Sequence, residues 1–362
     1  MIDKLCDEAL ERDSTVVCFY FDFAARNEQS PANILGSLLR QLVSGEGEIP
    51  EAITRDFRND KRAIGGRGLQ VSGIVKIKIL LEWKNVDPNL PGTDGNGSLG
   101  CAAINGHGGV VKLLLERENV DPNRRNKNDR TPLVCAAIEG HEGVVKLLLE
   151  RGDVDPNLPG TDGDGPLGCA AINRHEGVVR LLLKRENVDP NQRNENDRTP
   201  LGCAALKGHE GVVKLLLERE DVDPNLPDTD GNGPLGCAAI NGHEGVVKLL
   251  LERENVDPNR RNKQGRTPLV CVAFDGHEGV VKLLLEREDV DPNLPNKNDR
   301  TPLVCAALKG HEGVVKLLLE RQDLDPNLPD TDGNGPLGCA AIKGHEGVVK
   351  LLLERENVDP NR

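Results

Sequence analysis

The sequence predicts a mainly α-helical solenoid of helix–turn–helix–loop units of 34 residues, preceded by a small truncated α/β segment. Three observations predict this fold. All eight histidines recur every 34 residues, from His107 to His345, and eight of the ten cysteines share that interval, from Cys101 to Cys339. Proline and glycine recur at fixed positions in each 34-residue period. Ahead of the repeats the composition changes, because five of the seven aromatic residues lie in the first 60 residues.

Residues 131–157 show the local chemistry of one unit. Thr131 suits an N-cap, and Pro132 suits the first helical position, where no amide donor is needed. A slim helix rich in Ala and Cys follows, and Gly140-His141 ends it. We expect a second helix with a broad apolar face to run as far as Asp-Pro-Asn at residues 155–157, because proline cannot continue a helix.

No single unit can bury the leucines of its second helix, so neighbouring units must stack and share a core. Thr-Pro-Leu, Ala-Ala, Gly-His and Val-Val-x-Leu-Leu-Leu at these offsets resemble the ankyrin repeat over about residues 90–362. We expect eight complete ankyrin repeats in residues 95–362, and a half repeat with a junction in residues 74–94. The resemblance implies a protein that binds other proteins in a concave groove lined by loop tips and first helices.

Half of the units depart from the family pattern at the first helix. Glycine replaces the threonine cap at Gly97, Gly165, Gly233 and Gly335. These glycine-type units (G) and the threonine-type units (T) follow the order G-T-G-T-G-T-T-G, which indicates copying in pairs followed by one slip. The glycine-type units also carry glycine inside the first helix, which costs about 1 kcal/mol relative to alanine. We therefore expect them to be the weakest units of the array.

The second helix of the last repeat, expected at residues 346–356, has the same apolar pattern as the second helices of the other repeats. Ankyrin arrays normally finish with a unit whose outer face is polar. Three explanations follow: the natural chain continues, a partner covers this end, or the end associates with itself.

Residues 1–73 form a separate segment. Residues 15–23 are β-branched and aromatic and predict a buried strand between helices. The string Phe-Tyr-Phe-Asp-Phe-Ala-Ala-Arg-Asn-Glu-Gln-Ser at residues 19–30 resembles the nephrocystin-like, NACHT-type NTPase domain found ahead of ankyrin arrays in fungal proteins. The sequence contains no G-x-x-x-x-G-K-[ST] phosphate loop. We therefore expect a partial NACHT/nephrocystin-like segment that binds no nucleotide.

The repeated cysteines and histidines do not predict a metal site. Structural zinc takes four converging ligands, whereas each unit offers one Cys and one His. Asp-Thr-Asp-Gly-Asn-Gly at residues 228–233 and 330–335 mimics the start of a calcium loop, but Ala239 and Ala341 stand where the bidentate Glu is needed. No Ser-His-Asp or Cys-His catalytic set is recognisable. We expect buried structural cysteines, no catalytic residue, no metal and no cofactor.

The charge and hydropathy exclude other classes of partner. A net charge of −13 without a basic stripe argues against nucleic acid. No run of residues approaches the roughly 20 apolar residues that a membrane span needs. The first 12 residues lack the apolar core of a secretory signal. We expect an intracellular protein of the cytoplasm with no membrane contact.

Differences between near-identical copies predict where a partner is contacted. Phe274 is the only aromatic residue of the eight complete units, and aromatic and arginine residues are preferred at binding hot spots. The candidate contacts are Asn105, Glu139, Asn173, Lys207, Asn241, Asp275, Lys309 and Lys343 beside the Gly-His turn, Arg124, Arg125, Arg260 and Arg261 and the exposed leucines Leu158, Leu226, Leu294 and Leu328 at the tips, and Phe274.

The sequence therefore predicts a non-enzymatic scaffold that binds another protein through the concave face and loop tips of its ankyrin array. The scarcity of anchor residues predicts a polar, extended partner. Two alternatives to this scaffold stay open. In the first, the chain is a fragment of a STAND-type signalling NTPase with an ankyrin sensor, and in the second it is a non-functional degenerate copy of one.

Overall fold

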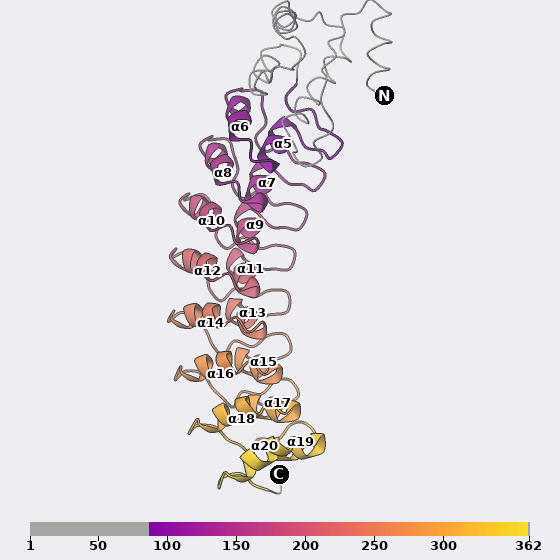
Figure 1. The fold of residues 1–362 in the computed structure, drawn as a ribbon, viewed down its shortest axis with the longest axis vertical. Helices are drawn as coiled ribbons and strands as arrows, with labels where there is room; N and C mark the ends of the chain where they lie inside the picture. Colours follow the sequence, from indigo (N-terminus) through magenta and orange to yellow (C-terminus); the bar gives the residue numbers. More distant parts are fainter. Residues whose placement is uncertain (1–86, 361–362) are drawn as a thin grey trace, which may run out of the picture. The chain divides into compact units, whose positions relative to one another are not determined.

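The structure, a computed structural model, describes residues 87–360. This part of the chain contains sixteen α-helices and no β-strand (Figure 1). None of these helices is long and apolar enough to cross a membrane. The strand expected at residues 15–23, and most of the expected half repeat, lie outside the described residues.

The chain divides into two compact units, Met1–Thr161 and Asp162–Arg362. The described part of the first unit holds two helix pairs, α5 (Ser98–Ile104) with α6 (Gly108–Leu115) and α7 (Pro132–Glu139) with α8 (Glu142–Leu149). The second unit holds six pairs: α9 (Pro166–Ile172) with α10 (Glu176–Leu183), α11 (Pro200–Lys207) with α12 (Glu210–Leu217), α13 (Pro234–Ile240) with α14 (Glu244–Leu251), α15 (Pro268–Asp275) with α16 (Glu278–Leu285), α17 (Pro302–Lys309) with α18 (Glu312–Leu319), and α19 (Pro336–Lys343) with α20 (Glu346–Leu353).

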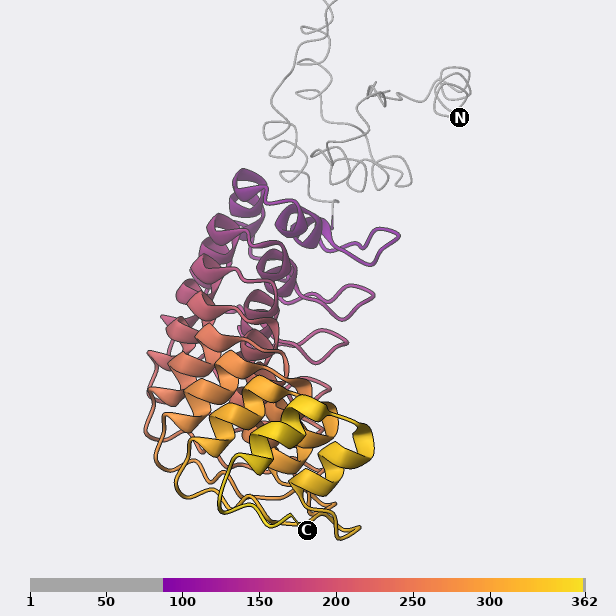
Figure 2. The same cartoon turned by 60° about the horizontal axis from the view of Figure 1, so that its bottom comes forward.

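Within each unit the pairs stack in two layers. First helices pack on first helices, as α15 does on α17, and second helices pack on second helices, as α16 does on α18. Figure 2 shows the stack of the second unit from the side of α19 and α20. The long loops between pairs extend on the side of the first helices (Figure 1). The eight pairs confirm the predicted solenoid of 34-residue units.

The core of each repeat is built from side chains that the period places on facing surfaces. Leu148, Val144 and Val145 of α8 are at most 2% exposed, and their equivalents in the other second helices show the same burial, except for the half-buried Val349 in α20. The first helices contribute alanines that are almost fully buried, such as Ala136 and Ala137. These small side chains let successive first helices approach closely. Apolar burial of this kind contributes about 25 cal/mol per Å².

The two kinds of unit begin their first helices differently, as predicted. In the threonine-type units the hydroxyl oxygen accepts a hydrogen bond from a backbone N–H, for example from Val134 to Thr131 at 3.3 Å and from Gly202 to Thr199 at 3.1 Å. The helices that begin after Gly97, Gly165, Gly233 and Gly335 have no side-chain cap. One amide in each of these four helices therefore lacks the bond that the threonine supplies.

Polar side chains fasten each repeat to the next. In the second unit, Asn225 donates its side-chain amide to the backbone carbonyl of Asn255 at 2.6 Å and accepts a bond from the backbone N–H of Asp257 at 3.0 Å. On the other side of the pair, the Nε2 of His243 lies 3.0 Å from the carbonyl of Leu206 in the preceding repeat. The same contacts recur in the neighbouring repeats. They satisfy backbone groups that the short helices leave without partners.

The second helices end earlier than the sequence predicts. The Asp-Pro-Asn at residues 155–157 was expected to end the helix, but α8 ends at Leu149, and α20 ends at Leu353 rather than at residue 356. The chain leaves the helix through a backbone turn, in which the N–H of Arg151 bonds to the carbonyl of Leu148 at 3.1 Å, and Val154 then turns back into the core. Arg151 also donates to the carbonyls of Leu115 at 3.2 Å and Arg117 at 3.3 Å in the preceding repeat.

Most turns between paired helices contain glycine with a positive φ angle, but one contains arginine. Gly106 and Gly242 occupy this place with a φ of 69°, and Arg174 adopts a φ of 62° in the otherwise identical Asn-x-His context. A Cβ atom on Gly242 would lie 3.0 Å from the ring of His277 in the next repeat. Arg174 therefore adopts an unfavourable backbone conformation at a position where the histidine ring of the next repeat leaves little room for a Cβ atom.

Replacing Arg174 with glycine is expected to raise the free energy of unfolding by about 1 kcal/mol, because glycine adopts the left-handed conformation without a steric penalty. The reciprocal change Gly242→Arg, in the same turn two repeats later, is the matched control and should lower it by a similar amount. Urea denaturation followed by circular dichroism measures both. An Arg174→Gly variant no more stable than the parent would contradict the prediction.

Candidate protein-binding surface

A row of variable side chains follows the C-terminal ends of the first helices. Each variable residue is the last residue of a first helix or the C-cap of that helix. Because successive first helices pack on one another within each unit, the equivalent residues of neighbouring repeats lie side by side. The charged members Glu139, Lys207, Asp275, Lys309 and Lys343 are all exposed. They form no salt bridge among the described residues. We call the predicted positions of this kind the turn row, which consists of Asn105, Glu139, Asn173, Lys207, Asn241, Asp275, Lys309 and Lys343.

The three asparagines of the turn row also serve the fold. Asn105, Asn173 and Asn241 are C-caps, and each donates its side-chain amide at 2.8 Å to the carbonyl of the cysteine four residues earlier. These bonds satisfy a carbonyl at the end of a short helix. The asparagine side chains are therefore held against their own helices, whereas the charged members of the row are not tied in this way.

The structure brings two of the predicted residues together with one that the sequence did not single out. Phe274, at the end of α15, is half-buried. The ammonium of Lys309 lies 4.2 Å from the centre of its ring, and the guanidinium of Arg266 lies 5.2 Å from it. We call these three side chains the Phe274 cluster. The only sequence signal for Arg266 is that the next loop carries Asn296 where two other loops carry aspartate.

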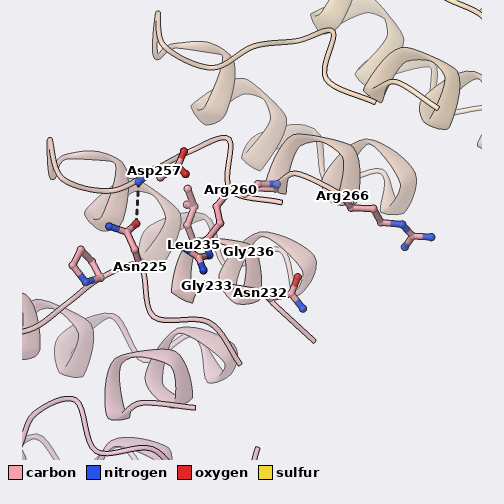
Figure 3. A pocket seen from close by; sticks show the side chains of 10 residues that line it. Asn225, Asn232, Gly233, Leu235, Gly236, Asp257, Arg260 and Arg266 are labelled. Carbon is pink, nitrogen blue, oxygen red and sulfur yellow. Dashed lines mark hydrogen bonds between the residues drawn. The ribbon is translucent and has the colours of Figure 1, made fainter. Parts of the chain in front are cut away.

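Two of the tip arginines lie over glycine caps. Arg260 folds back over Gly233, where a Cβ would lie 3.5 Å from the arginine Cδ, and Arg124 lies in the same way over Gly97 at 3.3 Å. Figure 3 shows Arg260 pointing toward Gly233 in a small hollow. The hollow also borders Gly236, and glycine leaves space there for the arginine stem. The half-buried Arg124 and Arg260 thus contact the preceding repeat.

The other tip arginines are exposed. Arg125 donates to the carbonyl of Pro159 at 3.0 Å, which ties it to the following loop. The side chain of Arg261 is exposed and forms no hydrogen bond or salt bridge with another described residue. Arg266 also lines the hollow of Figure 3 but points away from Arg260.

The expectation that the four tip leucines are exposed was wrong. All four are half-buried, and the set is Leu158, Leu226, Leu294 and Leu328. Each follows an asparagine of the inter-repeat contacts; for Leu226 this is Asn225, which is bonded to the next loop, and the preceding Pro224 is buried. The anchored backbone keeps the leucine close to the body of the repeat.

The calcium-loop-like stretches are turns closed by their own aspartates. The Oδ1 of Asp228 accepts bonds from the backbone N–H groups of Asp230 at 3.0 Å and Asn232 at 2.9 Å. Its Oδ2 lies 3.3 Å from the guanidinium of Arg198 in the preceding loop. Asp330 makes the equivalent contacts. Among the described residues, no group of three or more His, Cys, Asp and Glu side chains is placed to hold a metal ion.

The repeated cysteines are free thiols inside the stack. Seven of the eight are buried, and Cys101 is half-buried. For Cys237, burial and then the charge of Asp228 raise the pKa of the thiol to about 12. A thiol with so high a pKa holds almost no thiolate near neutral pH and is a poor nucleophile. The cysteines therefore fill space in the core, as the sequence predicts.

The last helix pair carries the large apolar side chains with the greatest exposure. Ile342 on α19 is 66% exposed and Leu353 on α20 is 57% exposed. In the preceding pair the equivalent residues are covered by the next repeat, so Leu319 is only 8% exposed. The end face of this pair is therefore more apolar than the rest of the described surface.

Comparison with protein families agrees with this architecture. A model described as ankyrin repeats, three copies, matches residues 72–159, 153–228, 220–296 and 288–362. A second model, described as the N-terminal part of nephrocystin 3, matches residues 1–76. No curated protein matches the sequence. The chain belongs to the ankyrin-repeat family and carries a nephrocystin-like segment at its N-terminal end.

Proposed function

We propose that this chain is a non-enzymatic scaffold whose array binds another protein through its first-helix face and loop tips. Ankyrin repeats in general mediate protein–protein interactions. The observation that carries the proposal is a contrast within the array. The histidine and asparagine contacts that join repeats are the same throughout, whereas the exposed turn row changes between Asn, Glu, Lys and Asp. A constant frame with variable exposed side chains is the arrangement of a recognition surface.

We propose that the chain consists of three segments. Residues 1–73 are a partial NACHT/nephrocystin-like segment, residues 74–94 a half repeat with a junction, and residues 95–362 the eight ankyrin repeats. The proposed partner is a polar, extended polypeptide, because the described residues hold a single aromatic side chain as an anchor. The net charge of −13 makes nucleic acid an unfavourable partner.

The binding face can be tested by site-specific photo-crosslinking. A photoreactive amino acid placed at Lys207, on the turn row, is expected to crosslink to protein partners in cell extract. The matched control is Lys214, which is exposed in the same repeat but lies on the second helix α12. Partners captured from Lys207 and not from Lys214 support the proposal. Equal capture from both places, or capture from Lys214 alone, would refute the first-helix face as the binding surface.

A second candidate function rests on residues 1–76, which match the N-terminal part of nephrocystin 3 and resemble part of a NACHT-type NTPase domain. In that case the chain is a piece of a signalling NTPase with an ankyrin sensor. The two functions differ in nucleotide binding, because a ligand that binds the folded state raises its stability. We expect saturating MgATP to leave the melting temperature of the full chain unchanged, relative to ATP without magnesium. A rise with MgATP would favour the NTPase.

We also propose that the apolar end face of α19 and α20 allows the chain to associate with itself. An exposed apolar face on a helix pair is a place where protein chains can associate. Sedimentation velocity is expected to show an average mass that rises with concentration, and Ile342→Lys combined with Leu353→Lys should abolish the rise. Lys350→Glu, an exposed change on the same helix, is the control. A constant monomer mass in the parent chain would contradict self-association.

A further inference from the structure

The loop tips of the second unit are joined by side-chain pairs thirty residues apart. Arg198 pairs with Asp228 at 3.3 Å, and Arg300 pairs with Asp330 at 3.5 Å. Where both members are amides, as at Asn232 and Asn262, the pair is a hydrogen bond of 2.9 Å. In the two charged pairs, an arginine at the end of one loop thus contacts a carboxylate of the next loop.

The slip in the alternation of unit types breaks this pattern once. The repeats that begin at Thr267 and Thr301 are both threonine-type, so Arg266 is followed thirty residues later by Asn296 and not by an aspartate. The side-chain oxygen of Asn296 accepts bonds from the backbone N–H groups of Asn298 at 2.8 Å and Arg300 at 3.2 Å. Asn296 therefore closes its own turn, as Asp228 does, but brings no negative charge to Arg266.

Arg266 lies instead over the ring of Phe274, at 5.2 Å from its centre. The equivalent residues in the flanking repeats are Ile240 and Leu308, which offer no aromatic ring. Lys309 places a second positive charge 4.2 Å from the same ring centre. Neither Arg266 nor Lys309 forms a salt bridge with any residue between 87 and 360.

The chemistry of the cluster favours a carboxylate ligand. A ring face attracts a cation but leaves the N–H groups of guanidinium and ammonium able to donate hydrogen bonds. The ring also restricts the two cations, which lowers the entropy lost when they bind an anion. Asp275, the neighbour of Phe274, is the acidic member of the turn row at this place and opposes such a ligand. The cluster holds two positive charges against this one negative charge.

We infer that the Phe274 cluster binds the acidic side chains of an extended segment of a partner protein. This inference rests on the proposed function, because it places the segment on the first-helix face. A carboxylate of the segment pairs with Arg266 and a second one with Lys309, and the intervening residue contacts the ring of Phe274. Two cations in a chain of net charge −13 are too few for the several phosphate contacts through which a nucleic acid binds.

The probe is a fluorescein-labelled peptide of six Glu-Ser repeats, with Gln-Ser and Lys-Ser peptides of equal length as controls. Fluorescence anisotropy with the full chain at low salt is expected to show binding of the Glu-Ser peptide alone. Added salt should weaken that binding, because the attraction between exposed charges is screened. Equal affinity for the Gln-Ser peptide would overturn the inference. Tighter binding of a single-stranded DNA of matched charge would replace it with a nucleic-acid site.

Substitutions locate the site. Arg266→Gln and Lys309→Asn are each expected to weaken Glu-Ser binding about threefold, the range of a partly exposed ion pair. Arg198→Gln is the matched control, since this arginine already pairs with Asp228, and should leave the affinity unchanged. Phe274→Leu, which copies the neighbouring repeat, should weaken binding while the melting curve is retained. An unchanged affinity in Arg266→Gln and Lys309→Asn would overturn the inference.

A gain of charge gives the sharpest test. Asn296→Asp supplies Arg266 with the carboxylate that Arg198 and Arg300 have, and the turn at this position already accepts aspartate in two other loops. It should weaken Glu-Ser binding as much as Arg266→Gln does, without loss of stability. Asp275→Asn should strengthen binding. If these variants leave the peptide affinity unchanged while crosslinking from Lys207 persists, the inference fails and the proposed function stands.

Discussion

The structure depends on a bridging asparagine at the start of each long loop. Asn259, for example, donates to the carbonyl of Asp289 at 2.6 Å and accepts from the N–H of Asp291 at 3.0 Å, so one side chain satisfies two backbone groups of the next repeat. The helices have only seven or eight residues, and helices this short are marginal in isolation. The bridges hold successive pairs at one spacing, and that spacing allows the apolar faces to bury one another.

A histidine provides the matching contact on the far side of each pair. His277 lies 3.1 Å from the carbonyl of Ile240, and His311 lies 3.0 Å from that of Phe274. Because the ring reaches over the preceding repeat, a Cβ atom on Gly276 would lie 2.7 Å from the ring of His311, and among the described turns only the one at Arg174 carries a side chain at this place. One histidine and one glycine are therefore constrained together, which explains why both recur without change in almost every unit.

The period of the sequence was sufficient to predict the fold, because it gives helix starts, turns and buried faces at once. Thr131 and Pro132 begin α7 as predicted, and Cys135 is buried as predicted. The ends of the second helices were not predictable from local signals, because the chain leaves α8 at a turn from which Val154 goes back into the core that neighbouring repeats share. The Phe274 cluster was missed for the same reason. It depends on Lys309 of α17 lying over the ring of Phe274 in α15, a contact between successive repeats that no local pattern reveals.

The bridges also determine how the array responds to force. Each asparagine and histidine bridge joins a repeat only to its immediate neighbour, at sequence separations between 30 and 37 residues. Tension applied to the ends of either unit is therefore borne by every repeat interface in series, and the loss of one interface leaves the others intact. Extension should proceed in steps of one repeat, and each step should reverse when the tension falls, as in a spring made of identical coils.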